Sequence, residues 1–302
     1  MKISLKSIIM LFTAAIVWGF AFSAQVMVDT DVLGNFSFNG VRFILGSASL
    51  IPIVLIFERE KKDPAKLKRT CVAALIAGTV LFIASALQQY GISINHNAGK
   101  AGFITGLYTV LVPIIGFLVL KNKAGVNTWI AAALAVYGLF LLSAGDGFDQ
   151  INMGDVVVFI GAFFWAGHIL VIDKLVDNVS PVKFAMLQFL VCGVWNLIVA
   201  MLFENITWAG ITYTAIPILY TGIMSTGVAY TCQILGQKGT NPNLSAIILS
   251  TECVFSAVGG AIVLNETMDA KGYIGCVLVF LGILVSQIDL GAIKEKLQTR
   301  GK

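Results

Sequence analysis

Three ionisable residues, Arg42, His168 and Glu252, lie within stretches of the chain that are otherwise mainly apolar. Placing an ionised side chain in hydrocarbon costs about 2.5–3.5 kcal/mol even on lenient scales, so each is a candidate functional residue. A guanidinium binds anions and a carboxyl binds cations or a proton. The chemistry indicated is therefore reversible binding.

Glu252 lies about eight residues into its apolar stretch, which is about 12 Å at 1.5 Å per residue and close to the centre of a membrane. A low-dielectric environment favours the neutral form of a carboxyl, which suits a proton-coupling or cation-binding group. The alternative is a structural carboxyl that hydrogen-bonds to neighbouring helices. Glu252 is thus predicted as a candidate for both substrate binding and coupling.

Arg42 lies about two helical turns into its stretch, nearer one membrane surface. Its side chain is expected to meet a substrate carboxylate or to pair with Glu252 across a cavity. It can equally extend outward toward Asp29 or Asp31.

Two tryptophans, Trp18 and Trp165, lie about midway along their apolar stretches, where an interfacial anchor is not expected. They are predicted as aromatic walls of a cavity. His168 follows Trp165 by three residues on the same helix face. It acts either as a proton relay or, more commonly, as a hydrogen-bond donor between helices.

Neutral polar residues also cluster by helix. Thr226, Tyr230 and Gln233 stand at i, i+4 and i+7, which draws a polar stripe along one helix face. Such a stripe lines water or another helix, and Ser and Thr that only join helices contribute about 0.6 kcal/mol each. The predicted substrate-binding residues are Trp18, Arg42, Gln88, Tyr108, Trp165, His168, Tyr230 and Glu252.

The chain that must position these residues is too apolar to be water-soluble. It is 58% hydrophobic and 12% charged, with a mean hydropathy of +0.89, whereas a soluble surface needs about 25–35% charged residues. Spans of about 20 apolar residues cross a membrane as helices, because unpaired backbone groups are costly in lipid. Ten such stretches are predicted: 6–28, 36–57, 70–91, 98–120, 127–143, 154–172, 181–203, 213–236, 244–264 and 272–288.

Lysine and arginine are unevenly distributed among the loops between these stretches. Loops on alternate sides hold 17 of the 20 basic residues on one side and only Lys100 and Lys271 on the other. Because basic residues concentrate in cytoplasmic loops, this distribution predicts that both termini are cytoplasmic.

The two halves of the chain repeat each other weakly. Trp18 and Trp165 are 147 residues apart, and Arg42-Phe43 and Gln188-Phe189 are 146 apart. Five spans per half make an inverted repeat, because the second half then enters the membrane with opposite polarity. The predicted fold is an all-α polytopic membrane protein with repeats at 1–145 and 146–290 and a basic cytoplasmic tail at 291–302.

Several motifs match a known family in order and spacing. They are WG at 18–19, NGVRF at 39–43, AGFITGLY at 101–108, GVAY at 227–230, LSTECVF at 249–255 and LNE at 264–266. The chain resembles the EamA type of the drug/metabolite transporter superfamily. Two departures are Cys253, where the family usually has proline, and Lys121-Asn122 in place of a glutamate.

The resemblance implies ten helices in two inverted repeats, residence in the cell inner membrane, and export of amino acids or other small organic metabolites. An importer or exchanger and a non-transporting membrane scaffold remain alternatives. The chain carries no HExxH or GxSxG motif and no aspartyl pair, so no enzyme activity, cofactor or metal is predicted. The expected partners are a small-molecule substrate and the lipid bilayer, without nucleic acid, and both a monomer and a homodimer remain open.

Overall fold

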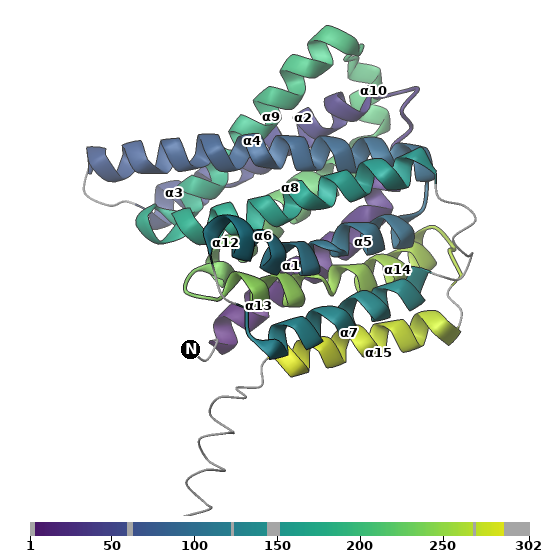
Figure 1. Cartoon of the computed structure of the whole chain (residues 1–302). Coiled ribbons are helices and arrows are strands. Elements are labelled where there is room, and N and C mark those ends of the chain that lie inside the picture. Colours follow the sequence, from purple (N-terminus) through teal and green to yellow (C-terminus); the bar gives the residue numbers. More distant parts are fainter. Residues whose placement is uncertain (1–3, 59–62, 122–123, 144–151, 268–269, 287–302) are drawn as a thin grey trace, which may run out of the picture.

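The computed structural model describes residues 4–58, 63–121, 124–143, 152–267 and 270–286 (Figure 1). Over these ranges the chain forms helices and no β-strand. The predicted tail at 291–302 lies outside the described residues.

The helices follow one another with short connections. The first half holds α1 (Leu5–Val26), α2 (Asn35–Ser49), α3 (Ile51–Phe57), α4 (Pro64–Asn95), α5 (Ala98–Gly106), α6 (Tyr108–Leu120) and α7 (Val126–Ser143). The second half holds α8 (Met153–Leu175), η3 (Val176–Asn178), α9 (Pro181–Phe203), α10 (Trp208–Tyr213), α11 (Ala215–Leu219), η4 (Tyr220–Ala229), α12 (Tyr230–Gln237), α13 (Pro242–Leu249), α14 (Glu252–Val263) and α15 (Ala270–Ser286).

Eight helical segments in the described ranges are long and apolar enough to cross a membrane. Each coincides with one of the ten predicted stretches. The remaining two stretches correspond to shorter apolar helices, Val126–Gly138 and Ala270–Val285.

Several of the long segments are interrupted near their middle. Regular α-helical hydrogen bonding is interrupted at Leu107 between α5 and α6, and at Ser250 and Thr251 between α13 and α14. The hydroxyls of Ser250 and Thr251 donate to the carbonyls of Ile247 and Ile248, and such local bonds compete with regular helix. Interruptions of this kind are typical of helices that line a site within a transporter.

The segment η4 has π-helical geometry over ten residues. It follows Pro217, which is buried in α11 and cannot donate a backbone hydrogen bond. The Thr226 hydroxyl donates to the carbonyl of Thr221, five residues earlier, at 2.8 Å. π-Helical turns are rare and often occur at functional sites.

The helices pack closely in pairs. The closest partners are α7 with α15, α4 with α8 and α9, α2 with α9 and η4, and α1 with α14, and α7 and α15 lie side by side at one edge of the bundle (Figure 1). Glycine allows this proximity: a Cβ on Gly138 would approach the carbonyl of Gly275 to 2.6 Å, and one on Gly282 would approach that of Ala131 to 2.9 Å. Small residues of this kind are common at helix contacts within membranes.

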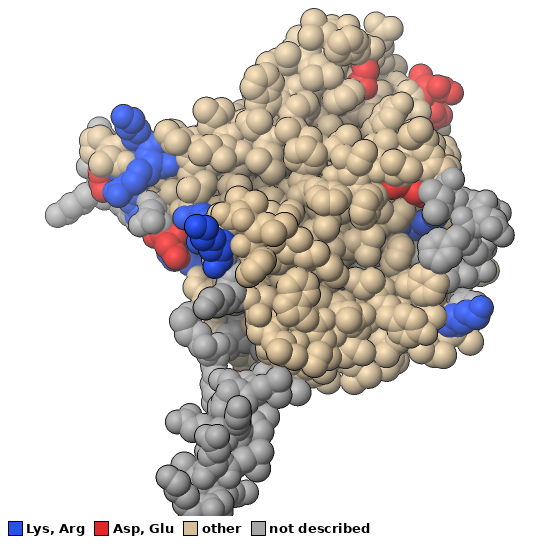
Figure 2. All heavy atoms as spheres, in the orientation of Figure 1, with Lys and Arg blue, Asp and Glu red and all other residues tan. Residues whose placement is uncertain are grey.

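On the face shown in Figure 2, charged side chains gather at the two ends of the bundle, and the described surface between them is uncharged. At one end, Glu58 accepts hydrogen bonds from the backbone N–H groups of Val182 (2.9 Å) and Lys183 (3.1 Å). At the far end of α9, Glu204 accepts from Phe36 (3.0 Å) and Ser37 (2.7 Å). Each carboxylate thus closes the first turn of a helix from the other half, where the N–H groups lack partners and the helix dipole favours negative charge.

A third carboxylate makes a similar contact. Glu266 accepts from the backbone N–H groups of Ala98 (3.0 Å) and Gly99 (3.4 Å) at the start of α5. Close by, Lys100 pairs with Asp155 at 2.6 Å. These contacts fasten the loops at this end to one another.

Candidate functional site

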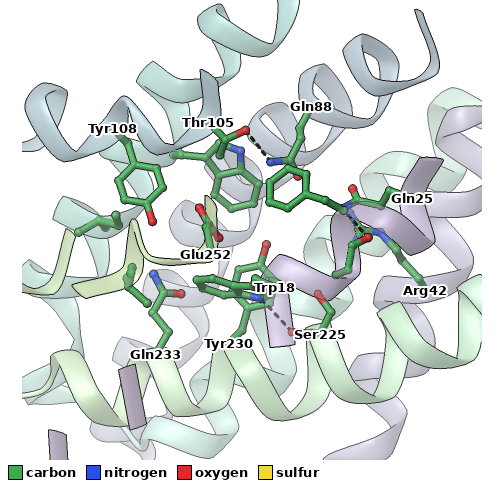
Figure 3. Close-up of a pocket in the computed structure, with 15 residues that line it drawn as sticks. Trp18, Gln25, Arg42, Gln88, Thr105, Tyr108, Ser225, Tyr230, Gln233 and Glu252 are labelled. Atoms are coloured by element: carbon green, nitrogen blue, oxygen red, sulfur yellow. Dashed lines mark hydrogen bonds between the residues drawn. The ribbon is translucent and has the colours of Figure 1, made fainter. Parts of the chain in front are cut away.

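A cavity lies in the middle of the bundle, where segments from both halves meet (Figure 3). The cavity has a volume of about 30 Å³. That is room for about two waters. The lining residues are Trp18, Ala21, Phe22, Gln25, Arg42, Gln88, Thr105, Tyr108, Trp165, Ile169, Ser225, Tyr230, Gln233, Leu249 and Glu252.

The structure brings seven of the eight predicted residues to this cavity. The seven residues come from α1, α2, α4, α6, α8, α12 and α14. The first and the last of them, Trp18 and Glu252, are 234 positions apart in the sequence. The eighth, His168, is fully buried behind the wall. Its Nε2 lies 3.2 Å from Gln188 Oε1 on α9, so it bridges two helices.

Tyr230 is the centre of an aromatic cluster. Its ring lies 4.6 Å from that of Trp18 and stacks on Trp165 at 6.2 Å. The rings of Phe189 and His168 pack on it at 5.6 and 6.1 Å. Aromatic pairs at such separations stabilise a fixed arrangement by about 0.5–1.5 kcal/mol each. The cluster therefore forms a stiff wall on one side of the cavity.

The π-helical segment helps to position Trp18. Its indole Nε1 donates to the carbonyl of Ser225 at 3.2 Å, the same oxygen that accepts the backbone N–H of Tyr230. One carbonyl thereby contacts both the Trp18 ring and the backbone of Tyr230.

Arg42 is 2% exposed and lines the cavity. Its Nε donates to Asn39 Oδ1 at 2.7 Å, and Asn39 in turn donates to the carbonyl of Ser85. The guanidinium carbon lies 4.6 Å from the ring centre of Phe43 and 5.4 Å from that of Phe38. These contacts hold the side chain in place without neutralising it.

No ion pair of Arg42 with a carboxylate forms among the residues that the structure describes. The expected pairing with Glu252 is not made, although both side chains line one cavity, and Figure 3 shows them well apart. The outward extension toward Asp29 or Asp31 is not adopted either, because the side chain is buried.

Glu252 is 4% exposed and is the first residue of α14, directly after the interruption at Thr251. Tyr108 is likewise the first residue of α6, directly after the interruption at Leu107. The Tyr108 hydroxyl points toward the Glu252 carboxyl (Figure 3). The two interruptions thus place a carboxyl and a phenol together in the cavity.

Neutral polar groups complete the lining. Gln88 Nε2 donates to Thr105 Oγ1 at 3.1 Å. In the described part of the chain, Gln25 Oε1, Gln233 Oε1 and Trp165 Nε1 are buried without a hydrogen-bond partner. Leaving such groups unpaired costs about 1–3 kcal/mol each, so they are available to a bound solute.

Gln25 is not among the predicted residues. It follows Trp18 by seven positions, and residues at this spacing share a helix face. That spacing would have identified it. Thr105 and Ser225 belong to the neutral polar residues that cluster by helix in the sequence, and both line the cavity.

The sequence profile of the EamA-like transporter family matches residues 5–144 and 152–287. The chain belongs to the EamA-like transporter family. This membership agrees with the resemblance carried by the motifs at 18–19 and 249–255.

Named relatives of this EamA-like chain are also transporters. An uncharacterized transporter of Archaeoglobus fulgidus is 28% identical over 90% of this chain and 82% of its own length. The uncharacterized transporter YwfM of Bacillus subtilis is 23% identical over 90% of each chain. The aromatic amino acid exporter YddG of Salmonella typhimurium is 25% identical over 78% of this chain and 83% of its own length.

A solved crystal structure has the same fold. It superposes with a TM-score of 0.73 at 17% sequence identity and covers 93% of this chain and 96% of its own. At this identity the likeness concerns the fold alone.

Proposed function

We propose that this EamA-like transporter carries zwitterionic organic solutes of the amino-acid type, and that the central cavity is its binding site. The observation that carries the proposal is that one cavity holds a guanidinium and a carboxyl, Arg42 and Glu252, that do not neutralise each other.

The argument rests on the energetics of buried charge. A charge in a low-dielectric interior is costly unless it is paired. Arg42 is held by Asn39 and two phenylalanine rings and has no carboxylate partner among the described residues. A solute carboxylate supplies that partner, and the planar guanidinium is suited to bind it with two hydrogen bonds.

The rest of the cavity fits the other parts of such a solute. Glu252 and the Tyr108 hydroxyl can accept hydrogen bonds from an ammonium group, since both offer oxygen lone pairs. Trp18, Trp165 and Tyr230 offer aromatic faces to an apolar side chain. Their arrangement supports the proposal that aromatic amino acids are among the solutes, as the name of the YddG relative also suggests.

The narrowness of the cavity supports alternating access. Space for about two waters cannot hold an amino acid, so the helices around the cavity must move apart when solute enters. The interruptions at Leu107 and Thr251 flank the cavity and lack regular helical bonding. We assign the hinge of this movement to them.

Two observations support an inverted repeat of five spans per half. The close pair α2–α9 is mirrored by the reciprocal caps, in which Glu58 follows α3 and closes α9, while Glu204 follows α9 and closes α2. The contacts of α1 with η4 and α12 likewise correspond to those of α4 with α8 when the halves are exchanged. In such repeats, rocking one half against the other exposes a central site to each side in turn.

We further propose that both termini are cytoplasmic, that the chain resides in the cell inner membrane, and that transport runs outward. The distribution of 17 basic residues on one side supports the orientation. Lys68 and Arg69 near the start of α4 lie beside Lys174 near the end of α8, in keeping with that orientation.

The test is counterflow in proteoliposomes loaded with phenylalanine. Three matched solutes are offered outside: phenylalanine, phenethylamine without the carboxylate, and 3-phenylpropionate without the amine. Only phenylalanine is expected to exchange, because each of the others leaves one buried charge unpaired. Equal exchange of phenethylamine and phenylalanine would contradict the proposal.

Two variants locate the effect in the cavity. Arg42→Gln is expected to abolish discrimination against phenethylamine, and Glu252→Gln discrimination against 3-phenylpropionate. His168→Gln is the matched control, because it changes a buried polar residue behind the wall. An imposed pH gradient that accelerates flux through the unmodified protein but not through Glu252→Gln would assign coupling to Glu252.

A further inference from the structure

A second hollow lies outside the central cavity, at the end of the bundle where α4 begins and α8 ends. It encloses about 520 Å³. Three basic side chains, Lys68, Arg69 and Lys174, line it together with apolar ones, which are Val72, Ala73, Ile76, Leu175 and Val179. We propose that this groove binds an anionic phospholipid, with the headgroup on the basic residues and an acyl chain along α4.

The charges favour an anion. Lys68, Arg69 and Lys174 are all exposed, and none forms a salt bridge within the part of the chain that the structure describes. Asp173 interacts with Lys174, and Asp177 with Asp173, but neither carboxylate lines the groove. Among the residues that the structure describes, three cations and no carboxylate line the groove.

The apolar floor favours a lipid over a soluble anion. Val72 is 50% exposed and Ile76 is 45% exposed, and both continue from the basic residues along one face of α4. Inorganic phosphate would bind the basic side chains and leave the apolar surface of Val72 and Ile76 uncovered. A molecule with a charged head and a hydrocarbon chain covers both, and burial of apolar area adds to its affinity.

The position along α4 matches the membrane boundary. The helix has 32 residues, or about 48 Å, and exceeds a hydrocarbon core of about 30 Å. Its start projects beyond the neighbouring helices (Figure 1). Lys68 and Arg69 lie within its first two turns, at headgroup depth, and Ile76 lies about 10 Å further in. Basic pockets at such depths recognise anionic headgroups.

The test is native mass spectrometry of the full chain in detergent with added phosphatidylglycerol or phosphatidylethanolamine. The triple variant Lys68→Gln/Arg69→Gln/Lys174→Gln is compared with Lys121→Gln/Lys238→Gln/Lys271→Gln, which removes the same charge from exposed sites elsewhere. We expect retained phosphatidylglycerol to fall about tenfold or more in the first triple variant and to stay unchanged in the second. All six side chains are exposed, so both proteins should fold, which size-exclusion chromatography checks.

Four results would overturn the inference. Equal retention of phosphatidylglycerol by the two triple variants would place the lipid elsewhere. If the unmodified protein retained phosphatidylethanolamine as well as phosphatidylglycerol, the negative charge of the headgroup would have no role in binding. Displacement of phosphatidylglycerol by inorganic phosphate, or equally tight binding of its dihexanoyl form, would show a soluble-anion site that makes no use of the apolar floor. None of these results bears on solute exchange through the central cavity.

Discussion

The carboxylates at the ends of the bundle and the guanidinium at its centre differ in how many hydrogen-bond partners the protein gives them. Glu58, Glu204 and Glu266 each accept two backbone N–H groups from the start of another helix. Among the described residues, Arg42 makes one side-chain hydrogen bond, which its Nε donates to the amide oxygen of Asn39. Within the described residues, each end carboxylate thus has two backbone donors as partners, whereas the central guanidinium has a single side-chain acceptor.

This difference separates structural from functional charge. Removing a carboxylate that satisfies two N–H groups leaves buried donors without partners, which lowers the free energy of unfolding. Removing an unneutralised buried charge relieves a desolvation penalty, so an apolar side chain of similar volume is neutral or stabilising. A substitution at an end carboxylate should therefore lower stability and leave solute selectivity unchanged. A substitution of Arg42 should lower transport and leave stability unchanged or higher.

The largest effect is expected for Arg42→Met, which keeps volume and removes charge. Exchange of phenylalanine should fall by about 100-fold, because loss of one partner from a buried charge pair costs about 2–5 kcal/mol. The unfolding temperature should stay the same or rise. Counterflow and thermal unfolding of the same preparation measure both quantities, and a lower unfolding temperature with unchanged exchange would reverse the assignment of Arg42.

Glu204→Ala should do the opposite. The N–H groups of Phe36 and Ser37 lose their acceptor, and the free energy of unfolding should fall by about 2 kcal/mol. Solute selectivity of the protein that remains folded should not change. Glu204→Gln retains one acceptor oxygen and is the matched control. If alanine and glutamine variants unfold at the same temperature as the unmodified protein, the contact has no structural role.

Trp18→Phe is expected to have a smaller effect on transport. Phenylalanine keeps an aromatic face toward Tyr230 but loses the hydrogen bond to Ser225, which contributes about 1 kcal/mol. The concentration for half-maximal exchange should rise about fivefold, with the maximal rate preserved. Trp195→Phe is a control, since that indole is partly exposed and hydrogen-bonds to Thr79 away from the cavity. An equal shift in both variants would argue against a role for Trp18 in the cavity.

His168→Asn should change least. It shortens the side chain that joins α8 to Gln188 on α9, so a loss of about 1 kcal/mol in unfolding free energy is expected. Transport at several pH values should follow the profile of the unmodified protein. A changed pH profile would instead support a proton relay through His168.

The sequence predicted the helices better than their interruptions. Eight of the ten predicted stretches coincide with helices of spanning length, because apolar length alone decides whether a segment can cross a membrane. The interruption in the 98–120 stretch lies at Leu107, six residues before Pro113. The residue type at Leu107 does not mark it, because leucine is a good helix former.

The cavity residues were predictable where the residue type is costly in lipid. Arg42 and Glu252 stand out for that reason, and both line the cavity. The partner of Arg42 was not predictable, since Asn39 is one of several polar residues within reach along the chain. The contact between Glu204 and Phe36 joins positions 168 apart, and no local pattern specifies it.

That last contact also bears on how the protein is made. Glu204 is synthesised 168 residues after Phe36. The first N–H groups of α2 therefore lack the Glu204 carboxylate as an acceptor until then. Glu58, by contrast, is already in place when Val182 arrives. The acceptor for the start of α9 thus belongs to the earlier half of the chain, and the acceptor for the start of α2 belongs to the later half. Synthesis of the first half alone should yield a polypeptide with an open helix end.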